Sequence, residues 1–260
     1  MLTLAPLESA RFGFRTLRGT IEGDLDCAAL AQELADGQAD LAIVRLPAKR
    51  SYQIHGLHRF GLYPIHADTL VYYHCNLDTH EPHPLRNPQL QIVEANRGDA
   101  EGISTLIRSS FDDYTNHYHA NPLLSEASIL AGYEEWALGH LAGENQIAWV
   151  TKVDGRIAGL ACSAFDEAHG ICDGVLHGVH PDFGQIGIYT DLIRHTQRYF
   201  KARGFQTLRI STQVSNLPVQ RVWVREGFYF AKVFDTYHIN SMLHADPELA
   251  RLAGSPHQAT

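Results

Sequence analysis

A strand-to-helix turn carries the residue types best suited to binding an anion. The run Val179–Leu192 reads VHPDFGQIGIYTDL, so Gly184 and Gly187 separate an apolar strand from a periodic helix. Glycine lets backbone N–H groups approach a ligand closely, and the start of a helix adds positive potential. The run predicts a pyrophosphate site, with an ordinary strand-to-helix turn as the alternative.

Two titratable side chains precede this turn on the same predicted strand. Asp173 lies six residues before Val179, and His177 lies two residues before it. The period of two in a strand therefore predicts that all three side chains share one face. The alternatives are a solvent-exposed carboxylate at Asp173 and a packed, hydrogen-bonded ring at His177.

Composition excludes several classes of protein. The 260 residues are 45% hydrophobic, too apolar for a disordered chain, and 21 basic residues against 29 acidic ones leave a net charge of -8. Such a chain has no basic surface for nucleic acid. The four cysteines lack CxxC spacing, the N-terminus lacks a signal-peptide pattern, and no apolar run is long enough to span a bilayer. We therefore expect a cytoplasmic protein.

A proline-rich stretch divides the chain. Residues 80–88 hold three prolines, which end helices and central strands, so this stretch is predicted to be a linker. It separates an N-terminal α/β portion, residues 1–88, from a larger portion, residues 89–245, and residues 246–260 are expected to form a loose tail. The patterns of the first portion predict one helix and three strands: a helix at Asp26–Ala35 and strands at Phe12–Leu17, Ala39–Leu46 and Thr69–Leu77.

The larger portion alternates strands and helices. An Asp154-Gly155 pair between two strand patterns predicts a hairpin, and Ile103, Leu106, Ile107 and Phe111 fall on one helix face. The remaining elements are strands at Leu90–Ala95, Ile171–Val179, Gln206–Thr212 and Phe228–Ile239, and helices at Ser125–Leu141, Gly187–Arg203 and Leu217–Glu226. The prediction is an α+β protein with one mixed central sheet flanked by helices.

Three motifs in this order make residues 90–240 similar to the GNAT acetyltransferase superfamily. Leu90–Ala100 resembles the first strand and helix start of that superfamily, and Val179–Leu192 resembles its pyrophosphate motif. Asn216–Phe228 resembles the last motif, an Asn followed by a helix that ends in Gly-Phe. The resemblance implies the GNAT fold and acetyl-CoA as the acyl donor.

By this resemblance, backbone groups near Val179 bind the pantetheine arm, with Asn216 and Trp223 beside the cofactor. Amides of one turn hold the pyrophosphate: Gly184, Gln185, Ile186, Gly187, Ile188, Tyr189 and Thr190.

The chain departs from the family pattern at two places. The family has Arg or Gln, then Gly, then Gly or Ala in its phosphate loop, where this chain has Gly184, Gln185 and Tyr189. Trp223 stands where the family has a Tyr that protonates the departing thiolate. An indole N–H is a donor but no useful proton source at neutral pH. The proton source is then Tyr189, Tyr229 or water, or the activity has been lost.

The attacking amine must be neutral, so the reaction needs a base or a chain of waters. Asp173 resembles the position where some family members carry a catalytic Glu, and a shorter Asp would act through water. His177 is the second candidate.

The loop between the first two helices often lines the acceptor pocket in this family, and its aromatic and amide side chains suit a polar ring. The predicted acceptor-binding residues are Tyr114, Asn116, His117, Tyr118 and His177. His117 and His119 lack a third ligand at a fitting spacing, so no metal site is predicted.

The N-terminal portion and the strand Arg209–Asn216 are similar to the dTDP-fucosamine acetyltransferases, which acetylate a 4-amino-4,6-dideoxy-sugar nucleotide. The expected partner is therefore a small amine, with a nucleotide-sugar as the specific candidate, and a homodimer is left open. Two alternatives remain: an N-acetyltransferase for an amino acid, a polyamine or a drug, and a non-enzymatic acyl-CoA-binding module.

One strand of the superfamily is missing after the Gly-Phe pair. Thr69–Leu77 is dense enough in apolar side chains to replace it, so we predict that this strand pairs with strands of the larger portion. The alternative is a separate small domain with its own sheet.

Overall fold

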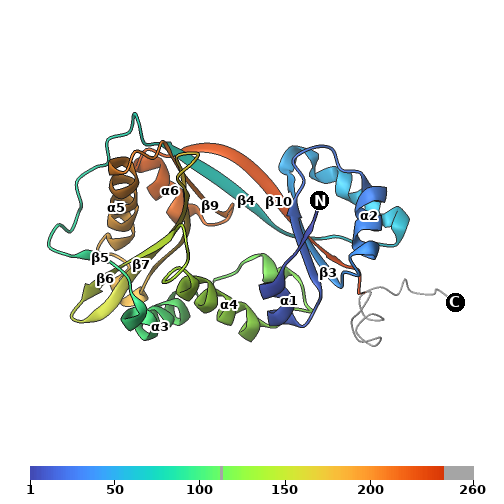
Figure 1. Cartoon of the computed structure of the whole chain (residues 1–260), viewed down its shortest axis with the longest axis horizontal. Coiled ribbons are helices and arrows are strands. Elements are labelled where there is room, and N and C mark those ends of the chain that lie inside the picture. The colour runs from blue at the N-terminus through green and yellow to red at the C-terminus, as the bar shows by residue number, and fades with distance from the viewer. Residues whose placement is uncertain (112–113, 243–260) are drawn as a thin grey trace. The chain divides into compact units, whose positions relative to one another are not determined.

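The computed structural model describes residues 1–111 and 114–242 (Figure 1). The expected tail at residues 246–260 lies outside the described residues. The first part of the chain contains β1 (Thr3–Leu4), α1 (Pro6–Phe12), β2 (Thr16–Thr20), α2 (Cys27–Asp36), β3 (Leu41–Pro47), the 3₁₀ segment η1 (Ala48–Phe60) and β4 (Ile65–Asn76).

The remaining elements follow the predicted alternation. They are β5 (Ile92–Glu94), η2 (Arg97–Asp99), α3 (Ala100–Phe111), η3 (His117–Ala120), α4 (Glu126–Gly139), β6 (Gln146–Val153), β7 (Arg156–Asp166), β8 (Ile171–Val179), η4 (Pro181–Phe183), α5 (Ile188–Ala202), β9 (Thr207–Gln213), α6 (Leu217–Arg225) and β10 (Tyr229–Asn240). The hairpin is confirmed, because β6 and β7 pair antiparallel and both Asp154 and Gly155 have positive φ.

The predicted strand at Phe12–Leu17 is wrong. Pro6 begins a short helix that ends at Gly13, whose φ of 71° lies in the left-handed region. Proline has a φ suited to the first turn of a helix, and glycine stops one cheaply, so these two residues outweigh the alternating pattern. The strand begins only at Thr16.

The strands follow the order β1-β2-β3-β10-β4-β9-β8-β7-β6-β5. β2–β3 and β8–β9 pair parallel, whereas β6–β7 and β7–β8 pair antiparallel. The expected α+β fold with a mixed sheet is therefore confirmed. β4 lies next to β9, and the Leu77 amide donates to the Gln206 carbonyl over 2.8 Å. The prediction that the strand at Thr69–Leu77 pairs with the larger portion is confirmed as well.

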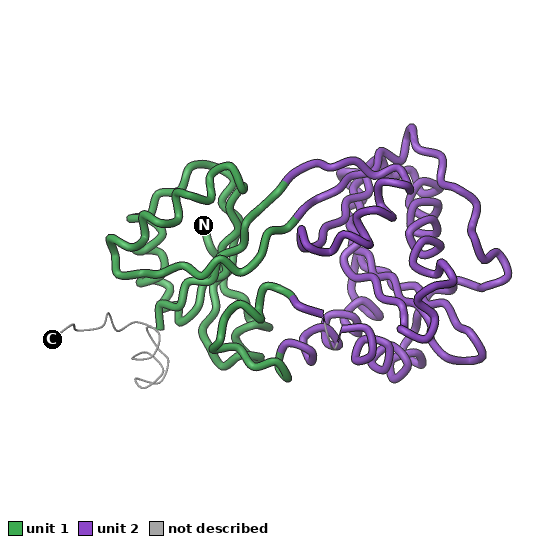
Figure 2. Tube along the Cα trace, turned by 180° about the vertical axis from the view of Figure 1, so that it is seen from behind, with its two compact units in different colours: residues 1–70, 116–128, 233–260 green, residues 71–115, 129–232 purple. Residues whose placement is uncertain are grey.

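The chain forms two compact units, each assembled from several stretches (Figure 2). Unit 1 comprises residues 1–70, 116–128 and 233–260, and unit 2 comprises residues 71–115 and 129–232. The consecutive ranges 1–88 and 89–245 stay a prediction.

Each unit has an apolar core of its own. In unit 1, α2 packs Leu30 and Leu34 against Val44 and Leu46 of β3. In unit 2, α3 packs the predicted face of Ile103, Leu106 and Ile107 against apolar residues of β6, β7 and β8. Burying such side chains is the main favourable contribution to folding.

Candidate functional site

The strands β8 and β9 stop pairing before either strand ends. Their register runs from Ile171 opposite Thr207 to Gly174 opposite Ile210. Within the described residues, β8 continues to Val179 with β7 as its one strand partner, and Val179 lies opposite Gly159. The Val179 carbonyl accepts from Ser110 Oγ over 3.0 Å. Backbone groups along an unpaired strand edge can bind an extended ligand as an added strand would. The far end of β8 therefore offers a suitable edge for such a ligand.

A bulge in β8 separates the two titratable residues of that strand. Gly174 lies opposite Ser163 and Leu176 lies opposite Cys162, so Val175 is an extra residue. Asp173 consequently lies opposite Ala164, and His177 lies opposite Ala161. Positions 161 and 164 face opposite sides of β7, and cross-strand partners share a face. The prediction that Asp173 shares the face of His177 and Val179 is therefore wrong.

Asp173 is held by an arginine on the neighbouring strand. Arg209 lies directly opposite it on β9 and donates from Nε and an Nη over 2.7 Å and 2.6 Å. This hydrogen bonding raises the pKa of Arg209. Both carboxylate oxygens are thus engaged, although the candidate role of Asp173 as a base stays a prediction.

Tyr189 and Trp223 form a donor–acceptor pair in which Tyr189 is half-buried. The indole Nε1 of Trp223 donates to the Tyr189 hydroxyl over 2.9 Å, and Trp223 is buried. An indole only donates, so the phenol keeps its own proton available for another acceptor. Burial raises the pKa of Tyr189, and the hydrogen bond from Trp223 opposes that rise. The hydroxyl is therefore a neutral proton donor at physiological pH.

His177 faces this pair from β8. Its ring centroid lies 6.0 Å from that of Tyr189. Burial lowers the pKa of His177 to about 4, so the ring is neutral at pH 7. Its enclosed Nε2 has no hydrogen-bond partner among the described residues. A neutral imidazole with a free nitrogen can accept a proton or a hydrogen bond from a ligand.

Two more side-chain hydrogen bonds are formed at the end of β9. The Tyr114 hydroxyl donates to Gln213 Oε1 at the end of β9, and Tyr114 lies close enough to raise the pKa of Tyr189. Asn216 precedes α6, and its Nδ2 donates to Thr212 Oγ1 over 3.1 Å. Gln213 was missed from the sequence, since a polar residue at the end of a strand carries no distinctive signal.

Tyr229 lies elsewhere in unit 2. It is 56% exposed at the start of β10, where its ring contacts His74 at a centroid distance of 6.1 Å. Among the described residues, no hydrogen bond joins it to Tyr189. Its predicted role as a proton donor remains untested.

Three predicted acceptor-binding residues lie in unit 1. Asn116 accepts a hydrogen bond from the Tyr118 amide and so caps the η3 turn. His117 Nδ1 lies 2.9 Å from Nε2 of His238, and Tyr118 packs against the His117 ring. Acceptor binding by these residues stays a prediction.

The predicted anion turn precedes α5 as expected. Gly187 is the N-cap of α5 with φ of 91°, a left-handed conformation that glycine adopts without strain. Ile188 is buried against Gly159, which leaves only its amide for a ligand. Gly184, Gln185 and Ile186 are exposed. The first amides of a helix have no carbonyl acceptor within it, so this turn can bind an anion.

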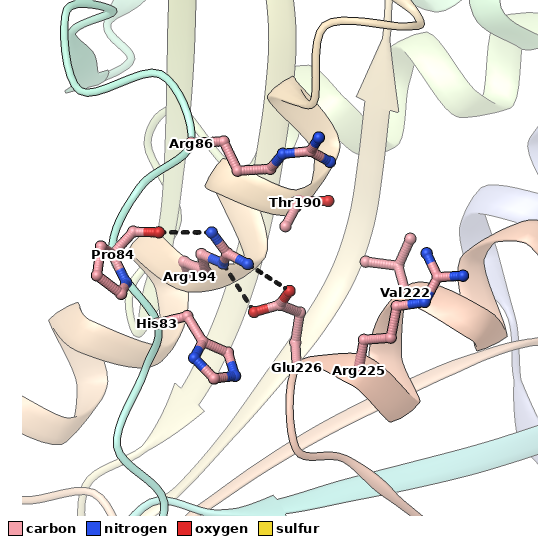
Figure 3. A pocket seen from close by; sticks show the side chains of 8 residues that line it. All are labelled: His83, Pro84, Arg86, Thr190, Arg194, Val222, Arg225 and Glu226. Atoms are coloured by element: carbon pink, nitrogen blue, oxygen red, sulfur yellow. Dashed lines mark hydrogen bonds and ion pairs between the residues drawn. The ribbon is translucent and has the colours of Figure 1, made fainter.

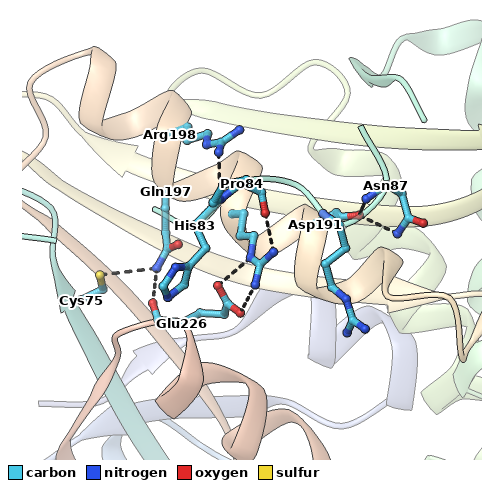
Figure 4. A network of polar contacts seen from close by, with 10 residues as sticks. Cys75, His83, Pro84, Asn87, Asp191, Gln197, Arg198 and Glu226 are labelled. Atoms are coloured by element: carbon cyan, nitrogen blue, oxygen red, sulfur yellow. Dashed lines mark hydrogen bonds and ion pairs between the residues drawn. The ribbon is translucent and has the colours of Figure 1, made fainter. Parts of the chain in front are cut away.

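The proline-rich segment is tied along one face of α5 (Figure 4). Buried Asp191 accepts from the amides of Arg86 and Asn87 over 2.6 Å and 3.0 Å, and from Asn87 Nδ2 over 2.8 Å. Further along α5, Arg194, Arg198 and Lys201 donate to the carbonyls of Pro84, His83 and His80. We call residues 80–87 the strap.

The strap and α5 border a positively charged pocket of about 420 Å³ (Figure 3). Its lining is His83, Pro84, Arg86, Thr190, Arg194, Val222, Arg225 and Glu226. Arg194 forms a buried two-point ion pair with Glu226, with both contacts at 2.8 Å. Arg86 and Arg225 therefore supply the charge that the pocket presents to a ligand.

Residues 106–228 match the acetyltransferase (GNAT) family. This part of the chain is similar to GNAT acetyltransferases. Over 152 residues the chain is 26% identical to the spore coat polysaccharide biosynthesis protein SpsD of Bacillus subtilis. That alignment covers 58% of this chain and 51%, about half, of SpsD.

Solved structures share the GNAT fold. A GCN5-related N-acetyltransferase from Sphaerobacter thermophilus superposes with a TM-score of 0.58 at 14% identity, covering 91% of this chain and 74% of its own. A tandem GNAT protein from the clavulanic acid biosynthesis pathway gives a TM-score of 0.58 at 13% identity, covering 84% of this chain and 70% of its own.

No group of three or more His, Cys, Asp or Glu side chains within residues 1–111 and 114–242 is arranged to hold a metal ion. In the same residues no helix combines the length and apolarity needed to cross a membrane.

Proposed function

We propose that the chain transfers an acetyl group from acetyl-CoA to the amine of a small acceptor. The observation that carries this proposal is the Tyr189–Trp223 pair, which keeps a proton donor beside the unpaired end of β8 in a GNAT fold. A proton donor next to a ligand-binding strand edge is what release of a thiolate requires.

The GNAT turn and strand edge suit the parts of acetyl-CoA. Backbone groups of β8 near Val179 would pair with the amides of the pantetheine arm, with Asn216 beside it. Amides from Gly184 to Thr190 would hold the pyrophosphate. The unpaired strand edge and the left-handed Gly187 support this assignment, because both expose backbone groups.

The chemistry is a direct transfer. The amine nitrogen forms a bond to the thioester carbonyl carbon, the C–S bond breaks, and an amide and free CoA result. Tyr189 would give its proton to the departing sulfur. His177, neutral and with a free Nε2, would accept a hydrogen bond from the amine and pass its proton to water. Asp173, which is paired with Arg209, would act only through water.

For the acceptor we propose a dTDP-4-amino-4,6-dideoxy-sugar. The distant similarity to a polysaccharide biosynthesis protein favours a sugar, and Tyr114 and Gln213 offer hydrogen-bonding groups near Tyr189. Another small amine is the second candidate, and the net charge of -8 is compatible with a cationic one such as a polyamine.

Thiol release from acetyl-CoA tests both proposals. The full chain is incubated with acetyl-CoA and dTDP-4-amino-4,6-dideoxygalactose, spermidine or an amino acid. The masses of the products are then measured by mass spectrometry. We expect release with the sugar nucleotide and a product heavier by one acetyl group. Release only with spermidine would overturn the sugar assignment. Binding of acetyl-CoA without release for any amine would leave an acyl-CoA-binding module.

A further inference from the structure

The predicted phosphate turn has no cation of its own. Residues 184–190 are Gly, Gln, Ile, Gly, Ile, Tyr and Thr, and the next residue is Asp191. Backbone amides supply only partial charges, whereas a pyrophosphate carries full negative charge. A cation at this turn must therefore come from another segment.

The strap brings Arg86 to the turn. A Cβ added to Gly187 would lie 3.2 Å from Cδ and Nε of Arg86 and 3.4 Å from its Cζ. The Arg86 side chain thus lies over the glycine that begins α5. Figure 3 shows it extending over the first turn of the helix near Thr190.

The position of Arg86 is fixed by its backbone rather than by its side chain. Its amide donates to Asp191 over 2.6 Å, and Asn87 makes two hydrogen bonds to the same carboxylate. Asn87 Nδ2 also donates to the Ile186 carbonyl over 2.8 Å, which ties the strap directly to the turn. Backbone contacts of the strap therefore keep the Arg86 guanidinium near the turn, and the guanidinium itself is not one of the groups that attach the strap.

The Arg86 guanidinium is also left for a ligand. The other cations along the strap are engaged: Arg194 with Glu226, Arg198 with His83, and Lys201 with Glu81. Within the described residues, Arg86 forms no ion pair, and its side chain is exposed. A free, positioned guanidinium beside unbonded amides suits a phosphate, which it can bind through two N–H donors.

We propose that Arg86 of the strap supplies the cation that binds the pyrophosphate of acyl-CoA at the Gly187 turn. This inference rests on the proposed function and names a residue that contacts its cosubstrate. The strap is then part of the cosubstrate site and not merely a connection between strands.

Binding measured by calorimetry tests the assignment without relying on turnover. The probes are CoA and dephospho-CoA, which lacks the 3′-phosphate but keeps the pyrophosphate. R86Q should weaken both at least tenfold, because a charge-assisted contact is lost at a group that both share. R86K should recover part of the affinity. R97Q, which removes an exposed cation outside the pocket lining and the strap, should leave both affinities within threefold.

Unchanged affinity of R86Q for both probes would overturn the inference, and so would a loss confined to CoA, which would move Arg86 to the 3′-phosphate. R86Q keeps the amide that bonds Asp191, and an unchanged melting temperature checks that the strap stays in place. If the parent protein binds neither probe, the proposed function fails instead.

Discussion

Two aromatic pairs with the same heavy-atom distance behave in opposite ways towards a proton. In unit 2, Trp223 Nε1 lies 2.9 Å from the Tyr189 hydroxyl, and in unit 1, His117 Nδ1 lies 2.9 Å from His238 Nε2. The first pair has a fixed donor and leaves the phenol proton available. In the second, one imidazole must donate to the other, and burial lowers the pKa of both rings.

The difference comes from the partner and not from the distance. Because the Trp223 indole can only donate, the Tyr189 hydroxyl accepts that hydrogen bond and keeps its own proton for another acceptor. The facing nitrogens of the two buried imidazoles have one proton between them. A second proton there would make one ring a cation, and burial would deprive that cation of its hydration. We therefore expect changes at the unit 2 pair to alter turnover, and changes at the unit 1 pair to alter stability.

The largest expected effect follows from removing the Tyr189 hydroxyl. Y189F should lower the rate of acetyl transfer about a hundredfold or more, while the affinity for CoA stays within threefold. The phenyl ring keeps the packing, so the loss isolates the proton. Steady-state kinetics with direct CoA titration measures both quantities.

Three matched variants accompany Y189F. W223F keeps Tyr189 but removes its donor, so turnover should fall less than in Y189F. Y229F should leave the rate nearly unchanged, since Tyr229 is exposed. H238Q in unit 1 should change the rate by less than threefold at a temperature where it is folded. Full activity of Y189F would move the proton transfer to water.

The stability of both units should fall in acid. Burial lowers the pKa of His238 in unit 1 and of His177 in unit 2 to about 4. Between the ordinary value of 6.5 and that pKa, the unfolded chain binds more protons than the folded one, so the free energy of unfolding falls as the pH falls. From pH 6.5 to 5 the loss is about 2 kcal/mol for each ring.

Denaturant unfolding at the two pH values measures this loss. H238Q and H177Q should each remove about 2 kcal/mol of the pH dependence. If H177Q leaves the pH dependence of the free energy of unfolding unchanged, burial does not prevent protonation of the His177 ring in the folded protein. His177 then does not resemble the buried histidine pair of unit 1.

A glycine substitution separates backbone strain from ligand contact. Gly187 in unit 2 and Gly61 in unit 1 have φ of 91° and 72°, both strained for valine. A Cβ at Gly61 meets nothing within 4 Å, whereas one at Gly187 meets Arg86. G187V should weaken CoA binding at least tenfold, about 1.4 kcal/mol, and G61V should not weaken it. Equal affinities by calorimetry would remove the anion site from this turn.

The sequence predicted those features of the site that depend on local backbone chemistry. Gly187 begins a helix, as its place before a periodic segment indicated, and Tyr189 meets Trp223, which the departure from the family pattern had singled out. The bulge at Val175 could not be predicted, because one inserted residue leaves no mark in an apolar strand. That single residue reverses the face of Asp173.

The strap was missed for a different physical reason. Its contacts are made by carbonyls and amides of residues 80–87, which any sequence presents. The signal lay in the partner helix, where Asp191, Arg194, Arg198 and Lys201 follow one another on one face. Such a stripe is also typical of a solvated helix surface, so only the fold reveals that a segment is bound to it.

The smallest effect is expected at Asp173. The bulge turns it away from the face of His177, and Arg209 engages both of its oxygens. A partly exposed ion pair contributes less than about 1 kcal/mol, and asparagine still accepts a hydrogen bond from Arg209. D173N should therefore change turnover less than threefold and leave the pH profile of the rate in place, as should R209Q.

A general base behaves differently, because its loss lowers the rate about a hundredfold and shifts the acid limb of that profile. One contradicting outcome is that D173N shows that loss, R209Q does not, and Y189F retains its affinity for CoA. The base is then Asp173 acting through water, and the reaction uses both faces of β8. If both D173N and R209Q lose activity equally, the ion pair positions the strand end instead.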